Sequence, residues 1–72
     1  MRRNELRFAT SSLGEHLVSL WALKPKPYHD YLIDGSYGDT KLGALWNLIK
    51  WMHRYGKLQE LFYIRSIKYE QK

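Results

Sequence analysis

The chain has 72 residues and no cysteine, and its 12 Lys and Arg against seven Asp and Glu give a formal net charge of +5 at pH 7. This length leaves room for one domain, residues 1–72, and the lack of cysteine excludes disulfides and thiolate zinc sites. We expect no signal peptide and no membrane span, because no stretch approaches ~20 apolar residues, and hence a cytoplasmic location. The basic balance favours nucleic acid or an acidic protein as partner.

Aromatic residues are plentiful, with three Trp, six Tyr and two Phe. Large rings supply much of the core in so short a chain, where burial on folding is marginal. Chains of this size are often stabilised further by oligomerisation or by a partner. A homodimer is therefore an open alternative to a monomer, and aromatic side chains are candidates for the interface as well as for the core.

The N-terminal segment predicts a basic arm followed by a short strand. Residues 1–4 are expected to be a flexible arm. Residues 5–10 (ELRFAT) place Leu6 and Phe8 on one face, which is the alternation typical of a strand.

A first helix is expected after this strand. Ser12 and Glu15 match a capping box, in which a serine begins a helix and a glutamate follows three residues later. The apolar residues that follow, as far as Leu23, fall within one arc of a helix. Lys24–Pro25 would end it, because the residue before proline avoids helical dihedral angles.

A connecting loop is expected over residues 24–39. Its distinctive stretch, HDYLIDGSYGDT from His29 to Thr40, contains three aspartates and no Lys or Arg. The aspartates do not have the spacing of a calcium-binding loop. Asp34–Gly35 is a typical turn dipeptide, and Asp39 or Thr40 can cap a following helix. We therefore expect a turn and a helix cap here, with no bound metal.

A second helix is expected over residues 41–54, with Trp46 and Met52 in its apolar stripe and Trp51 at the edge as the exposed aromatic residue. Tyr55–Gly56 would end it, since glycine readily takes the left-handed conformation found there. The polar face holds the residues at positions 43, 47, 50 and 54, which share one side of a helix.

The C-terminal segment, residues 58–69, is rich in β-branched and aromatic residues and is expected to be a strand. The predicted fold is α+β, with two amphipathic helices packed on a small antiparallel sheet formed by the N- and C-terminal strands. Two alternatives stay open: an all-α three-helix fold, and a fold in which residues 46–69 form a β-hairpin.

The basic residues carry the strongest functional signal. Arginine and lysine contact phosphates and asparagine can read a base edge, while an exposed tryptophan can stack on a base. The residues expected to contact nucleic acid or a partner are Asn47, Lys50, Trp51, Arg54, Lys57, Arg65, Lys68, Arg2, Arg3 and Arg7. No motif of a metal site, cofactor site or catalytic nucleophile is present, so we expect no cofactor and favour a binding protein over an enzyme.

Residues 23–37 (LKPKPYHDYLIDGSY) resemble the segment before the central sheet in RelE/YafQ-type messenger-RNA interferase toxins. This resemblance covers fifteen residues. It implies a RelE-like fold containing the 46–69 hairpin, and a small ribonuclease with Arg54, Tyr55 and Arg65 on adjoining strands. His53, His29 or Tyr55 would then be the candidate for general acid–base catalysis.

The sequence is therefore compatible with three functions. The leading one is a small basic regulatory protein that acts on nucleic acid or on a nucleic-acid-handling protein through a Lys/Arg/Trp helix face. The second is the RelE/YafQ-like ribonuclease toxin. The third is a protein-interaction module or inhibitor of a host or phage protein, which would bind without the steep salt dependence of nucleic-acid contacts.

Overall fold

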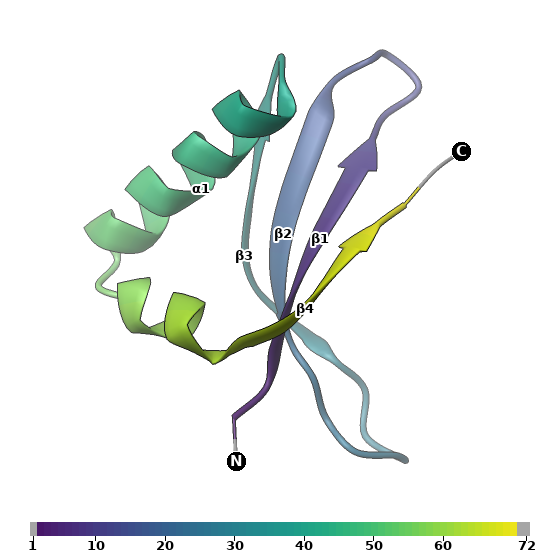
Figure 1. Ribbon diagram of the computed structural model, residues 1–72, viewed down its shortest axis with the longest axis vertical. Coiled ribbons are helices and arrows are strands. Elements are labelled where there is room, and N and C mark those ends of the chain that lie inside the picture. Colours follow the sequence, from purple (N-terminus) through teal and green to yellow (C-terminus); the bar gives the residue numbers. More distant parts are fainter. Residues whose placement is uncertain (1, 71–72) are drawn as a thin grey trace.

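The computed structural model describes residues 2–70 and shows a mixed four-stranded sheet with one α-helix lying across one of its faces (Figure 1). The elements in chain order are β1 (Asn4–Thr10), β2 (His16–Ala22), β3 (Tyr31–Gly38), α1 (Lys41–Arg54), the 3₁₀ helix η1 (Leu58–Tyr63) and β4 (Ile64–Tyr69). The strand order is β3-β2-β1-β4, in which β4 runs parallel to β1 and the other neighbours are antiparallel. None of the helices within residues 2–70 is long and apolar enough to cross a membrane.

The core lies between α1 and the sheet. Alternation along the two central strands turns every second side chain of β1 and β2 toward the helix. The helix contributes residues spaced by four positions, which share one face. The buried cluster consists of Leu6, Phe8, Val18, Leu20, Ala44, Leu48 and Met52.

The expected helix after residue 12 is wrong, because residues 16–22 form β2. Val18, Leu20 and Ala22 alternate toward the core, whereas the expected helical stripe relied on Leu17, Leu20 and Trp21. Pairing with β1 decides in favour of the strand. The capping-box signal belongs to a hairpin turn instead. The Ser11 backbone N–H donates to the Glu15 carbonyl (2.8 Å), and Gly14 has a positive φ of 85°.

The expected connecting loop over residues 24–39 is also wrong, since its second half is β3. Asp34–Gly35 is not a turn: Asp34 lies opposite Leu20 in the ladder, and a register shift follows between Leu20 and Trp21. The chain reverses earlier, where the Tyr28 N–H donates to the Pro25 carbonyl (2.9 Å). Sequence statistics favour a turn at Asp–Gly, but pairing with a neighbouring strand overrides them.

The second helix and its ends are confirmed. The Gly43 N–H donates to the Thr40 hydroxyl at the N-terminus (2.9 Å), and Gly56 follows the helix with a φ of 70°. The strand at the chain start is confirmed as β1. The C-terminal strand is confirmed only for residues 64–69, because residues 58–63 form η1.

The α+β class therefore holds, but the predicted architecture of two helices on a sheet of the terminal strands is wrong. The all-α alternative is wrong because four strands are present. The RelE-like alternative with a 46–69 hairpin is wrong because residues 46–54 are helical.

Arg2 and Asn4, which lie where a flexible arm was expected, contact η1. Arg2 forms an ion pair with Glu60 (Nη1 to Oε2, 2.7 Å). Asn4 is buried, and its Nδ2 donates to the Glu60 carbonyl (2.8 Å). Met1 lies outside the described residues.

Candidate functional site

Helix α1 is held on the sheet by close packing at its first turns. A Cβ atom on Gly38 would come within 2.9 Å of the Ala44 Cα, so the strand and helix backbones can approach this closely only through glycine. One turn later the Asn47 Nδ2 donates to the Tyr37 carbonyl (2.8 Å). These contacts set which side of α1 faces the sheet, because Ala44 and Leu48 point inward and the opposite side is left to solvent.

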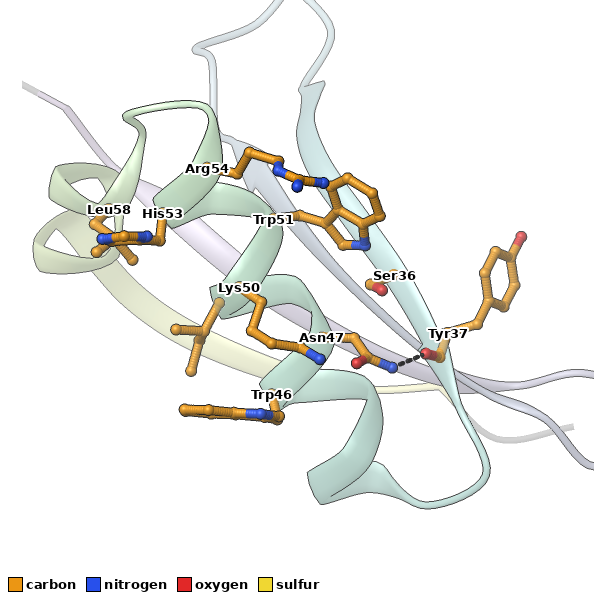
Figure 2. Close-up of a pocket in the computed structure, with 10 residues that line it drawn as sticks. Ser36, Tyr37, Trp46, Asn47, Lys50, Trp51, His53, Arg54 and Leu58 are labelled. Atoms are coloured by element: carbon orange, nitrogen blue, oxygen red, sulfur yellow. Dashed lines mark hydrogen bonds between the residues drawn. The ribbon is translucent and has the colours of Figure 1, made fainter.

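The solvent side of α1 is a basic and aromatic surface, which we call the α1 outer face. It comprises Trp46, Asn47, Lys50, Trp51, His53 and Arg54. Figure 2 shows Asn47, Trp51 and Arg54 on the side near β3, Trp46 and His53 on the other side, and Lys50 between them. Among the described residues that line this surface, none is acidic. Its charged side chains, Lys50 and Arg54, are therefore both cations.

The two tryptophans of this face differ in their surroundings. Trp51 stacks on Tyr55 (ring centroids 5.9 Å apart, planes at 16°), and the Arg54 guanidinium lies 5.5 Å from the Trp51 ring centre. Trp46 is 60% exposed, against 41% for Trp51. The expectation that Trp46 packs in the core is wrong, because the buried stripe of α1 is narrower than the apolar pattern and is centred on Leu48. Met52 is buried, as expected.

Lys57 belongs to a second basic cluster beyond the end of α1. It lines a depression of about 490 Å³ together with Arg2, Arg3 and Lys24. Glu60 is the acidic residue that lines this depression within residues 2–70, and it pairs with Arg2. Three of the residues expected at the site, Arg2, Arg3 and Lys57, therefore meet here rather than on the α1 outer face.

Arg7 lies on the face of the sheet that α1 does not cover, where it is tied to two carboxylates. Its Nε donates to Glu5 (2.7 Å) and its Nη2 to Asp30 (2.9 Å), while its guanidinium lies 4.6 Å from the Trp21 ring centre. Ser66 adds a hydrogen bond to Glu5 (2.8 Å). The Arg7 guanidinium is already bound to both carboxylates. We therefore assign this network a structural role and do not expect Arg7 to contact phosphate.

The network shifts the pKa values of Glu5, Arg7 and Asp30. Hydrogen bonds from Arg7 and then Ser66 hold the pKa of Glu5 below its ordinary value. The pKa of Asp30 is lowered chiefly by the Lys24 backbone N–H and secondarily by Arg7. The pKa of Arg7 is raised above its ordinary value, mainly by its hydrogen bond to Glu5.

The remaining predicted site residues lie on β4, away from the α1 outer face. Lys68 is opposite Arg7 in the parallel ladder, on the uncovered side of the sheet, and Arg65 stands at a register shift in the same strand. The residues that the toxin resemblance would use are likewise divided. Arg54 and Tyr55 end α1, whereas Arg65 is on β4.

The three aspartates of the 29–40 stretch take separate roles. Asp30 binds Arg7 and the Lys24 N–H. Asp34 accepts the Gly35 N–H through Oδ1 (2.8 Å), while its Oδ2 is buried without a partner. Asp39 precedes the Thr40 cap. Within residues 2–70 no three His, Asp or Glu side chains gather as a metal site would require.

No protein-family model, curated protein or solved structure matches the chain. The side chains of the chain itself are therefore the basis for proposing a function. Sequence periodicity found Asn47, Lys50 and Arg54, because residues at this spacing share one side of a helix. The same pattern did not predict that Trp46 is exposed, and it did not predict the Glu5–Arg7 ion pair. Alternation along residues 5–10 could have indicated this pair, since it puts both side chains on one face.

Proposed function

We propose that the protein is a small regulatory protein that binds nucleic acid through the α1 outer face. One observation supports this most: Lys50, Arg54 and two partly exposed indoles share one helix surface that no carboxylate lines within residues 2–70. Cations neutralise phosphates, and indoles stack on bases. The combination fits a nucleic acid better than it fits a purely anionic small molecule.

Each side chain has a distinct role in this proposal. Lys50 and Arg54 contact the phosphate backbone, and the exposed Trp46 stacks on an unpaired base. The side-chain amide nitrogen of Asn47 is already engaged, because Nδ2 donates to the Tyr37 carbonyl. Its Oδ1 stays available to accept a hydrogen bond from a base edge.

The second basic cluster extends the contact surface. Lys57 follows α1 directly and lies with Arg3 and Lys24 around one depression. A strand that crosses the α1 outer face can continue onto these cations past the end of the helix. A homodimer would present two such surfaces and raise the affinity for a continuous strand. We further propose that the protein acts in the cytoplasm.

A charge-reversal experiment tests the proposal. The Lys50→Glu, Arg54→Glu double variant should lose affinity for labelled oligonucleotides by a factor of ten or more, on the order of two lost phosphate contacts, and its affinity should depend less steeply on salt. The matched control is Lys26→Glu with Lys68→Glu, which changes the net charge equally at positions that line neither the α1 outer face nor the second basic cluster. Equal losses in both double variants would attribute binding to net charge and overturn the assignment to α1.

A protein partner is the second candidate function, and a specific observation favours it. Leu42 and Trp46, which lie one helical turn apart on α1, are exposed by 78% and 60%. Large apolar side chains exposed together are typical of protein interfaces. An acidic protein bound through this surface would form a stoichiometric complex that survives nuclease treatment, whereas the leading proposal expects nuclease to release the partner.

A further inference from the structure

Within residues 2–70, strand β4 pairs with β1 alone and so forms an edge of the sheet. An edge strand presents unpaired N–H and C=O groups that can pair with another chain. The other edge, β3, is interrupted by a register shift next to Trp21, and the Asn47 side chain already occupies the Tyr37 carbonyl. From Ser66 onward β4 keeps a regular register and is the better template for strand addition.

The direction of the backbone groups on β4 follows from one hydrogen bond. The Glu70 N–H donates to the Phe8 carbonyl (2.7 Å). In a parallel ladder, alternate residues direct both backbone groups toward the neighbouring strand. Ser66 and Lys68 therefore point toward β1 along with Glu70, whereas the N–H and C=O of Ile67 and Tyr69 point to the free edge.

We propose that two copies of the chain pair through β4, antiparallel and with Ile67 opposite itself across a two-fold axis. In this register Ser66 lies opposite Lys68, and Arg65 lies opposite Tyr69. No two like charges face each other directly across this pairing. The edge is thus self-complementary, as a two-fold interface requires.

Burial also favours this pairing. Ile67 and Tyr69 are 54% and 57% exposed, and both share the helix-bearing side of the sheet with Leu6 and Phe8. Tyr69 already stacks on Phe8 (ring centroids 5.1 Å apart). A two-fold axis perpendicular to the sheet places both helices on the same side. The exposed Ile67 and Tyr69 side chains of two copies then meet above one continuous eight-stranded sheet, which enlarges the marginal core of a 72-residue chain.

A cysteine scan tests the register, because the native chain has no cysteine. Residues paired through backbone hydrogen bonds across an antiparallel ladder have Cα atoms about 5.5 Å apart, within the range that a disulfide spans. Ile67→Cys should therefore oxidise to a covalent dimer. Tyr69→Cys is the matched control: its two copies would be roughly 14 Å apart along the strands, too far for a disulfide, and it should stay uncrosslinked.

A charge exchange provides an independent readout on folded protein. Ile67→Lys and Ile67→Glu should each be monomeric in sedimentation, since like charges would then face each other, and their equimolar mixture should dimerise. Far-ultraviolet circular dichroism shows whether each variant is folded. A monomeric native protein, equal crosslinking at positions 67 and 69, or a mixture that stays monomeric would each overturn the proposal. These experiments test the dimer, whereas the Lys50→Glu, Arg54→Glu variant tests nucleic-acid binding by α1, so either proposal can fail while the other stands.

Discussion

Gly38 and Ala44 bring strand β3 and helix α1 into backbone contact. A Cβ atom on Gly38 would lie 2.8 Å from the Gly43 carbonyl carbon and 2.9 Å from the Ala44 Cα, so the two elements would have to separate. The same junction orients the α1 outer face, because the helix begins only three residues after Gly38.

Gly38→Ala is therefore expected to lower the free energy of unfolding by about 1–3 kcal/mol, the usual cost of overpacking. Urea denaturation measures it. Gly35→Ala in the same strand is the control, since a Cβ there would lie 3.4 Å from the Val18 carbonyl oxygen and should cost less. An equal loss in the two variants would show that close packing against α1 is not the cause.

The Glu5–Arg7–Asp30 network predicts a loss of stability in acid. The pKa values of Glu5 and Asp30 are both lowered in the folded protein. A group with a depressed pKa contributes stability above the pKa of its unfolded form, roughly 4 for these carboxyls. That contribution disappears as the pH falls through the folded pKa. The free energy of unfolding should be maximal above about pH 5 and should decrease below about pH 4.

Glu5→Gln is the variant that checks the source of this effect. It removes one of the two depressed carboxyls, so it should be less stable than the native protein near neutral pH and should lose less on acidification. Urea titrations at several pH values give both quantities. A Glu5→Gln variant with the native pH dependence would place the acid sensitivity elsewhere in the chain.

Asp30 and Asp34 should differ in their sensitivity to replacement by asparagine. Asp30 accepts from Arg7 and from the Lys24 N–H, so Asp30→Asn weakens an ion pair and should lower the melting temperature. Asp34 has a buried Oδ2 without a partner. Asp34→Asn keeps the oxygen that binds the Gly35 N–H and breaks no hydrogen bond at Oδ2, so its melting temperature should change less than that of Asp30→Asn. Thermal unfolding of the pair side by side distinguishes these roles.

Trp46 and Trp51 should separate binding from stability. Stacking of one base on an aromatic ring is worth about 1–3 kcal/mol, so Trp46→Ala should weaken oligonucleotide binding roughly 5- to 150-fold and leave the melting temperature nearly unchanged. Trp51→Ala removes the stack with Tyr55 and should cost about 0.5–1.5 kcal/mol of stability. Full retention of affinity by Trp46→Ala would exclude Trp46 as the stacking residue.

The amino-acid sequence alone determined the elements whose local signals agree with one another. Helix α1 combines an apolar stripe with the Thr40 cap and a glycine after its end, and its polar side necessarily carries Lys50 and Arg54. Strand β1 likewise follows from the alternation of Leu6 and Phe8. In these segments periodicity and end signals lead to a single structure.

Tertiary structure alone decided the rest. The residues of β2 fit a helix or a strand equally well, and those of β3 favour a turn at Asp34–Gly35. Both become strands because each supplies the hydrogen-bond partners and the apolar cover that the other lacks. The same long-range pairing brings Asp30 to Arg7, which is 23 residues earlier in the chain. Contacts over such separations depend on the whole sheet, and no local pattern encodes them.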